Sequence, residues 1–286
     1  MDFSERRHRF RQWLNGSQCV YPASVFDGLS ARMADDLGFE VAMFAGSVAS
    51  MTVTGAPDLM GMTLTEFSGQ AYRIARASKL PLLVDADDGY GNAINVMRTV
   101  CELENAGVAA MTLEDTKLPQ PFGHQGKTQL ISLEEGVKRI EASVASRSDA
   151  NFVIVGRTSA AILTNIDDAI ARLKAYADAG ADAIFPVGIR TLDEAGELYR
   201  VIGKPMIVYA GTDELSDMEN LAARGVRVAL QSHAPFAAAV QAVYETLKAQ
   251  KKGVAIKDLP RLADRELIER VTRQPDYKKW MSDFVC

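Results

Sequence analysis

The stretch "AGVAAMTLED", Ala106–Asp115, connects the end of an amphipathic helical pattern to a short apolar run. Gly107, just past the predicted helix, suits the left-handed conformation that often ends helices, and the apolar run begins directly after it. The same arrangement returns in "AGADAIFPVG" (Ala179–Gly188) and in "RGVRVALQSH" (Arg224–His233). A glycine cap that leads straight into a strand, repeated along the chain, predicts a regular alternation of helices and strands.

Eight apolar runs of strand length alternate with segments of helical pattern. We expect strands at Val20–Val25, Val41–Ala45, Leu80–Val84, Ala109–Leu113, Phe152–Val155, Ala183–Val187, Pro205–Tyr209 and Val226–Leu230. We expect helices at Ser30–Leu37, Thr65–Ala77, Val96–Ala106, Leu133–Ala145, Asp167–Ala179, Leu192–Val201, Met218–Arg224 and Ala237–Ala249. Strands that are apolar on both faces and are separated by helices pair in parallel. Eight such units predict an α/β fold, a single (β/α)8 TIM barrel domain over residues 1–286.

The competing fold is a doubly wound open sheet. That fold usually carries a GxGxxG phosphate-binding turn after its first strand, and "SVFDGLSAR" stands there instead. Two segments lie outside the eight units, an N-terminal helix in residues 1–18 and a C-terminal helical extension at 251–286. Tyr277, Trp280 and Phe284 recur at helical spacing in the extension, so this apolar face must pack against something, either the same barrel or another subunit.

Composition excludes several classes of protein. The chain has 286 residues, of which 48% are hydrophobic and 24% charged, and its net charge of -5 argues against a nucleic-acid or membrane-surface partner. Three cysteines without a CxxC pair and only three histidines argue against zinc, iron–sulfur clusters and a disulfide framework. The N-terminus is too charged for a signal peptide, and no apolar run is long enough for a bilayer. We therefore expect a cytoplasmic protein that binds small molecules.

Carboxylates follow the third and fourth predicted strands. In "LPLLVDADDGYGN" (Leu80–Asn92) the third strand ends at Asp85 and Asp87, the fourth ends at Glu114, and Asp58 lies in the loop after the second. In barrel enzymes the site is built at the carboxyl ends of the strands, so these four side chains can converge. Oxygen ligands without Cys or His select Mg²⁺, or alternatively Mn²⁺. The pattern predicts a metal site.

Structural alternatives exist for several of these residues. Asp85 or Asp88 could cap the helix that follows, which is a common role for Asp in that position. Glu114 could form an ion pair with Arg157, which ends the fifth strand. Arg157 could equally bind a substrate carboxylate, because its planar guanidinium matches that group.

Two further strand ends carry candidate groups. Gly46 and Ser47 follow the second strand, where backbone N–H groups could approach an anion, although Ser47 could also be an ordinary helix cap. His233 follows the eighth strand and could instead be a satisfied buried histidine.

Five segments together resemble the isocitrate lyase / phosphoenolpyruvate mutase superfamily. They are "SVFDGLSARMADDLGFEVAMFAGSVAS", "PDLMGMTLTEF", "LVDADDGYGN", "GVAAMTLED" and "VIVGRTSA". The resemblance implies a homotetramer with exchanged C-terminal helices, and an α-keto acid or its enolate held on Mg²⁺. It also implies direct metal binding by Asp85, with Asp58, Asp87 and Glu114 acting mainly through the metal's waters. Gly46, Ser47 and Arg157 would hold the carboxylate and keto oxygens of the substrate.

Departures from the family pattern indicate the branch. Lyases of the superfamily carry a Lys-Lys/Arg-Cys-Gly-His loop after the fourth strand, whereas this chain has "QPFGH" with Phe122 at the cysteine position. They also carry a glutamate after the sixth strand, where this chain has Val187. The loop "TKLPQPFGHQGKT" is a poor match to one that binds a phosphonate. What remains resembles the branch that decarboxylates oxaloacetate, whose histidine after the eighth strand matches His233 in "QSHAPF".

The expected activity is Mg²⁺-dependent decarboxylation of oxaloacetate, an α-keto dicarboxylate, to pyruvate and CO₂ through a metal-stabilised enolate. His233 is the first candidate for the donor to the enolate, with Tyr209 a weaker one and Arg157 as the substrate clamp. One alternative is a carbon–carbon lyase for a 2-methylisocitrate- or dimethylmalate-like acid, which would need a replacement acid such as His124. A barrel that binds a keto acid without turning it over is the alternative of a different class.

Overall fold

The computed structural model describes residues 3–123 and 126–285. In this part of the chain, eight parallel strands form one sheet in the order β1 to β8. The strands are β1 (Ala23–Ser24), β2 (Ala42–Phe44), β3 (Leu82–Asp85), β4 (Ala110–Glu114), β5 (Val153–Thr158), β6 (Ala183–Pro186), β7 (Met206–Tyr209) and β8 (Val226–Leu230). Each lies inside or within three residues of its predicted range, and the (β/α)8 barrel is confirmed.

The sheet closes on itself just before β1. Val20 bridges in parallel to Val228 of β8, and its N–H donates to the carbonyl of Arg227 at 3.0 Å. The predicted first strand, Val20–Val25, is thus split into this single bridge and the two-residue β1. Pro22 lies between them and has no N–H to donate to a neighbouring strand.

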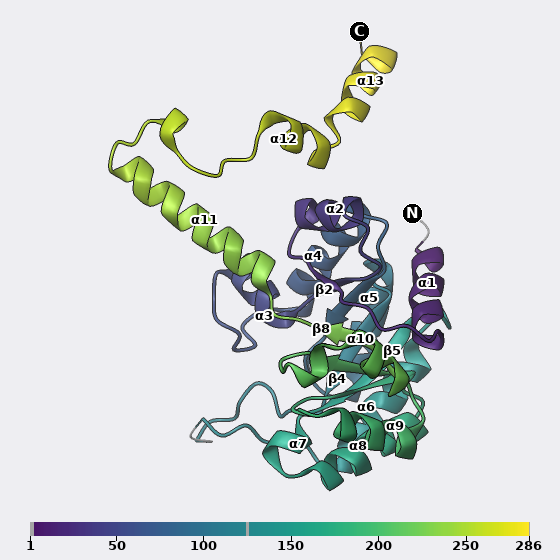
Figure 1. Cartoon of the computed structure of the whole chain (residues 1–286). Coiled ribbons are helices and arrows are strands. Elements are labelled where there is room, and N and C mark those ends of the chain that lie inside the picture. Colours follow the sequence, from purple (N-terminus) through teal and green to yellow (C-terminus); the bar gives the residue numbers. More distant parts are fainter. Residues whose placement is uncertain (1–2, 124–125, 286) are drawn as a thin grey trace.

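Helices surround the sheet (Figure 1). Those that follow the predicted pattern are α1 (Ser4–Asn15), α2 (Gly28–Asp36), α4 (Leu64–Ala77), α5 (Ala93–Asn105), α6 (Leu133–Ser146), α8 (Ile166–Asp178), α9 (Leu192–Ile202), α10 (Met218–Ala223) and α11 (Ala234–Lys251). The sequence patterns missed the short helices α3 (Gly46–Ala49) and α7 (Ala160–Leu163) and a π-helical turn, η1 (Ser50–Thr54). The remaining elements are the 3₁₀ turns η2 (Glu214–Ser216) and η3 (Ile256–Asp258), and the helices α12 (Arg265–Val271) and α13 (Gln274–Phe284).

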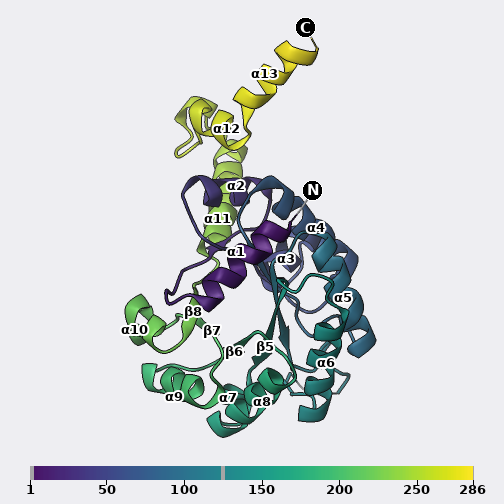
Figure 2. The same cartoon turned by 90° about the vertical axis from the view of Figure 1, so that its right-hand side faces the viewer.

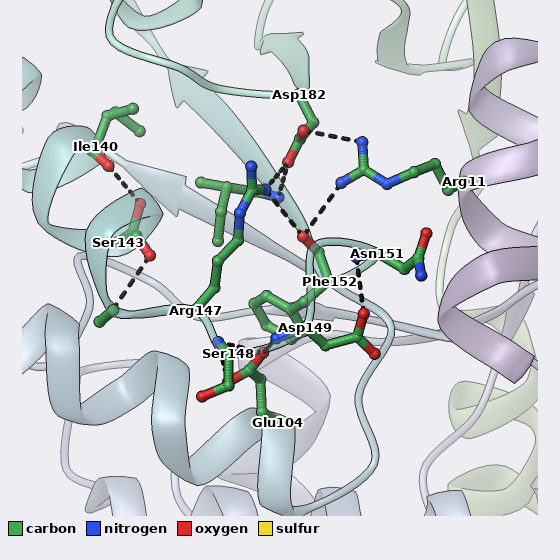
Figure 3. A network of polar contacts seen from close by, with 12 residues as sticks. Arg11, Glu104, Ile140, Ser143, Arg147, Ser148, Asp149, Asn151, Phe152 and Asp182 are labelled. Carbon is green, nitrogen blue, oxygen red and sulfur yellow. Dashed lines mark hydrogen bonds and ion pairs between the residues drawn. The ribbon is translucent and has the colours of Figure 1, made fainter. Parts of the chain in front are cut away.

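The first helix lies over the amino ends of the strands, on the face opposite the predicted site (Figure 2). Arg7 of α1 is buried, donates to the carbonyls of Val108 and Glu104, and forms an ion pair with Asp149 at 3.1 Å. Figure 3 shows the neighbouring polar network, in which Asp182 lies between Arg11 and Arg147, at 3.0 Å and 2.6 Å. These contacts fasten the N-terminal helix to the barrel.

The last barrel helix departs from the expected arrangement. α11 contains no buried residue, and Val240, Val243, Tyr244 and Leu247 are exposed along it. Figure 1 shows α11 running away from the barrel, so the segment predicted at Ala237–Ala249 does not cover the strands of its own chain. Near its start, Phe236 packs on Phe26 with ring centroids 5.4 Å apart, but the exposed apolar side chains further along α11 are not covered by the described chain.

The chain beyond α11 returns to touch the barrel at one point. Arg273 makes two contacts with the Asp36 carboxylate of α2, at 2.7 and 2.6 Å, and Arg32 donates to the carbonyl of Val271. α13 then extends outward with Tyr277, Trp280 and Phe284 exposed. None of the helices in the described residues has the length and apolar content needed to cross a membrane.

Candidate active site

Strand register brings the predicted carboxylates to one level of the barrel. Asp85 of β3 lies beside Thr112 of β4, and Glu114 of β4 lies beside Arg157 of β5. A cavity of about 300 Å³ opens at these strand ends. It is lined by Asp58, Leu59, Met60, Asp85, Asp87, Glu114, Leu118, Pro119, Gln120 and Arg157. The structure therefore brings together all four predicted metal residues and the predicted arginine.

Asp85 is held in place by its neighbours. Its Oδ2 accepts a hydrogen bond from Arg157 at 2.6 Å, and its Oδ1 accepts one from the Thr112 hydroxyl at 2.9 Å. Asp85 belongs to the strand, so it does not cap the helix that follows. The helix α5 is capped by Asn92, whose side chain accepts from the N–H groups of Ile94 and Asn95.

Arg157 joins the two strand-end carboxylates. Besides Asp85, it forms an ion pair with Glu114 at 2.9 Å, and its guanidinium lies over the ring of Phe185. Burial opposes the charge of Arg157, but Asp85 and Glu114 more than compensate and raise its pKa. Glu114 therefore does form the predicted ion pair with Arg157. The same ion pair holds Arg157 at the wall of the cavity.

Asp87 occupies an unusual backbone position. It is a non-glycine residue with φ of +49°, in the left-handed region, and its side chain is 8% exposed. A Cβ atom at Gly46 would lie 2.9 Å from Oδ1 of Asp87, so glycine at position 46 lets the backbone of α3 approach the carboxylate. This close approach accounts for a glycine at the first position of α3.

The cavity holds more negative charge than its arginine balances. Burial, followed by repulsion from Asp85, raises the pKa of Asp87 well above its ordinary value and raises that of Asp58. Burial raises the pKa of Glu114 to about 7, although Arg157 opposes this shift. Four carboxylates thus face one guanidinium, and protons or a cation must supply the missing positive charge.

The predicted anion-binding segment opens a helix. Ala45 is the N-cap of α3, so Ser47 is not a helix cap, and Gly46 and Ser47 are the first two helical residues. The N–H groups of a first helical turn have no partner within the helix. Gly46 lies against the Asp87 carboxylate at the edge of the cavity, but neither Gly46 nor Ser47 is among the residues that line it.

His233 lies between β8 and α11 and is half-buried. Its Nδ1 is 2.9 Å from the hydroxyl of Ser24, at the end of β1, a partner that the sequence patterns missed. Burial lowers the pKa of His233, and the Asp85 carboxylate opposes that shift. The imidazole is therefore favoured in its neutral form, and a Ser24 hydroxyl that donates to Nδ1 leaves the proton on Nε2.

Tyr209 is not part of the carboxylate cavity. It ends β7 with 49% of its side chain exposed, and with Ser24 it lines a separate groove of about 950 Å³ between the barrel and α11. His124, named as a replacement acid, lies outside the described residues. Phe122, at the position of the lyase cysteine, is fully exposed.

The donor set fits a hard divalent cation. All four candidate ligands are carboxylates, and the uncompensated negative charge favours a cation over a neutral ligand. Within residues 3–123 and 126–285, no three Asp, Glu, His or Cys side chains already form a coordination group. Carboxylates that line a cavity without closing on one point are compatible with Mg²⁺, because this ion keeps several waters and needs few protein ligands.

The fold and the site define a (β/α)8-barrel enzyme with an acidic, metal-type cavity at the carboxyl ends of its strands. The chain belongs to the phosphoenolpyruvate phosphomutase family, whose model matches residues 10–251. This confirms the predicted superfamily.

Known proteins resemble the chain over its whole length. A Bradyrhizobium protein (strain ORS 278) named oxaloacetate decarboxylase is 50% identical, and the match covers 100% of this chain and 99% of the relative. A solved oxaloacetate acetylhydrolase in complex with 3,3-difluorooxalacetate has a TM-score of 0.85 at 29% identity, covering 98% of this chain and 97% of the other. A phosphoenolpyruvate phosphomutase from Streptomyces platensis subsp. rosaceus has a TM-score of 0.87 at 29% identity, covering 98% and 99%.

Proposed function

We propose that the protein decarboxylates oxaloacetate to pyruvate and CO₂ with the help of Mg²⁺, or Mn²⁺ in its place. The observation that carries this proposal is the full-length relationship, at 50% identity, to a protein named oxaloacetate decarboxylase. The site supports it independently. The cavity offers a cluster of carboxylates and an arginine, and the reaction needs no covalent nucleophile. The neutral His233 does not line this cavity, although the charge of Asp85 acts on it.

The residues of the chain divide the work of this reaction. Arg157 and the first N–H groups of α3 bind carboxylate and keto oxygens of the substrate. When bound, the metal supplies a Lewis acid that stabilises negative charge on the keto oxygen. The bond to the departing carboxyl group breaks, its electron pair remains on the enolate of pyruvate, and the methylene carbon takes a proton. That proton comes from water, and the neutral His233 is the proposed hydrogen-bond donor to the departing carboxylate or to the enolate oxygen.

Lyase chemistry on a methylisocitrate- or dimethylmalate-like acid fits less well. Such cleavage needs an acid/base group in the loop after β4, and the described part of this loop offers the exposed Phe122 instead of a thiol. Of the two described free cysteines, Cys101 lies on α5 and Cys19 precedes β1, and neither lines the carboxylate cavity. The alternative of a barrel that binds a keto acid without catalysis makes a different prediction, namely that oxaloacetate binds tightly and no pyruvate forms.

The activity is tested by incubating the protein with oxaloacetate and Mg²⁺ and measuring pyruvate, CO₂, oxalate and acetate, with the metal-catalysed rate without protein subtracted. We expect pyruvate and CO₂ in equal amounts and loss of activity in excess EDTA. Oxalate and acetate would indicate hydrolysis, the reaction named for the acetylhydrolase. Pyruvate formed from methylisocitrate or dimethylmalate in preference to oxaloacetate would overturn the proposal in favour of a lyase.

Two variants separate the proposed roles. Asp85→Ala should abolish Mg²⁺-dependent turnover and leave the fold intact, because the metal loses its direct ligand.

His233→Ala should leave Mg²⁺ binding intact and lower kcat about a hundredfold, a typical loss for one donor. A His233→Ala variant that decarboxylates at the parent rate would make His233 a structural residue.

Assembly is a second part of the proposal. We infer that the chain forms a homotetramer in which C-terminal helices cross between subunits, in the cytoplasm. The supporting observation is the separation of α11 from its own barrel, which leaves apolar side chains on α11 and the apolar lining of the large groove exposed. A helix from another subunit would bury both.

A further inference from the structure

The turn that carries Asp87, one of the proposed metal carboxylates, is held in an uncommon conformation. Between β3 and α5, Asp87, Gly89 and Tyr90 all have positive φ, at 49°, 85° and 64°. Two of these three are not glycine, so surrounding contacts must impose the backbone. The position of the Asp87 carboxylate depends on those contacts.

Some of the contacts come from neighbouring elements. The N–H of Glu114 donates to the carbonyl of Asp87 at 2.8 Å, and the Thr99 hydroxyl of α5 donates to the carbonyl of Gly89 at 2.9 Å. The remaining centre of the turn is Asp88, which is 1% exposed and therefore cannot rely on water for its hydrogen bonds.

Arg139 of α6 reaches Asp88 from outside the cavity. It donates to the Asp88 carbonyl at 3.0 Å and contacts the carboxylate at 3.4 Å. Its other terminal nitrogen donates to Glu135, one helical turn earlier, at 2.9 Å, which fixes the guanidinium on α6. Arg139 is itself 7% exposed, and it does not line the 300 Å³ cavity.

We propose that Arg139 is a positioning residue for the metal-binding carboxylates and acts through Asp88 on the turn that carries Asp87. The inference rests on the proposed metal site. The Asp88 carboxylate also accepts a hydrogen bond from the N–H of Tyr90 at 3.0 Å. The ion pair between Arg139 and Asp88 therefore helps to hold both Asp88 and Tyr90 in the turn. Without Arg139, the turn loses the contact that orients its buried centre, and Asp87 loses its fixed direction.

The test measures Mn²⁺ binding to the full-length protein by electron paramagnetic resonance, without substrate, together with thermal unfolding. Arg139→Met should raise the Kd for Mn²⁺ roughly 10- to 100-fold, the usual effect of losing a partner that orients a metal ligand. Arg139→Lys should fall between this variant and the parent, because it keeps the charge but loses the paired geometry. Asp88→Asn should weaken binding less than Arg139→Met, since the amide oxygen keeps one of the two side-chain contacts and the backbone carbonyl of residue 88 still accepts from Arg139.

Lys138→Met is the matched control, because Lys138 is the neighbouring residue of α6 and its ion pair with Glu141 is exposed. It should leave the Kd unchanged. If the Arg139 variants and Asp88→Asn only lower the unfolding temperature and bind Mn²⁺ like the parent, Arg139 is purely structural and the inference is wrong. Should Arg139→Met fail to fold, Arg139→Lys and Asp88→Asn decide between the same outcomes.

Asp85→Ala distinguishes failure of the inference from failure of the proposed function. If Asp85→Ala loses Mn²⁺ binding while the Arg139 and Asp88 variants keep it, the metal site stands and the positioning role is refuted. If Asp85→Ala binds Mn²⁺ as tightly as the parent, the metal lies elsewhere, and both the proposed site and the role of Arg139 are refuted.

Discussion

Glu114 shows how burial and neighbouring charges compete at one residue. Its carboxylate is 2.9 Å from Arg157, which favours the ionised form, yet it is 8% exposed and lies near Asp85. Burial is the larger effect and raises the pKa of Glu114 to about 7. The carboxylate is therefore partly protonated near neutral pH without a cation.

This shift predicts a pH dependence of stability in EDTA. Between the unfolded pKa near 4.5 and the folded pKa of about 7, the folded state binds more protons than the unfolded state. Stability from Glu114 is therefore present below the unfolded pKa and is lost as pH rises through the folded pKa. Glu114→Gln removes this dependence.

Chemical unfolding of both proteins from pH 5 to pH 8 should show the free energy of unfolding of the parent falling relative to Glu114→Gln, by roughly 1 to 3 kcal/mol. Glu134→Gln, an exposed change in the first turn of α6, serves as the control and should track the parent. A constant difference between parent and Glu114→Gln across this range would contradict the shifted pKa.

Among the secondary-structure elements, we expect α1 to contribute to stability and not to the site. It lies on the amino ends of the strands, where Arg7 and Arg11 bind carboxylates and backbone carbonyls of the loops before β4, β5 and β6. Residues on that face of a barrel usually stabilise the fold, whereas chemistry takes place at the other face.

Arg7→Met should therefore lower the free energy of unfolding by about 3 kcal/mol, because it removes the ion-pair partner of the partly buried Asp149 and one donor from each of the carbonyls of Val108 and Glu104. Turnover per folded molecule should stay at the parent value. Arg200→Met removes only an exposed ion pair on α9 and should change stability by less than about 0.5 kcal/mol. A lower kcat for Arg7→Met, measured under conditions in which the variant is fully folded, would show that α1 affects the site.

At the scale of the whole molecule, the barrel and the C-terminal segment differ in how far they bury their apolar side chains. The barrel buries its apolar residues in one core that runs from α1 to β8. The helices α11 and α13 bury none, although both carry large apolar side chains. Exposed apolar helices of this kind often mark a surface that another chain covers, which supports the proposed tetramer.

Light scattering at micromolar concentration should therefore give a mass about four times the 31.1 kDa of one chain. Trp280→Asp should shift the protein toward smaller species, because it puts a charge in the apolar face of α13. Lys279→Asp introduces the same carboxylate on the neighbouring exposed position and should leave the mass unchanged. A monomer for the unmodified protein refutes the tetramer.

Local patterns in the sequence were sufficient for the barrel and for the carboxylates. Strand-length apolar runs, helical periodicity and glycine caps are local properties, and they predicted eight strands, which the sheet holds side by side in the order of the chain. The carboxylates could be predicted to meet because parallel strands bring their carboxyl ends to one side.

What the tertiary structure alone decided lies in contacts between distant segments. Ser24 and His233 meet only because β1 and β8 close the barrel, and Arg139 reaches Asp88 only because α6 packs beside α5. The position of α11, which extends away from its own barrel, likewise could not be predicted from the sequence. The periodicity of its apolar residues is the same whether the helix covers its own barrel or another one. Periodicity reports that a face must be buried, but only the packed chain determines which surface buries it.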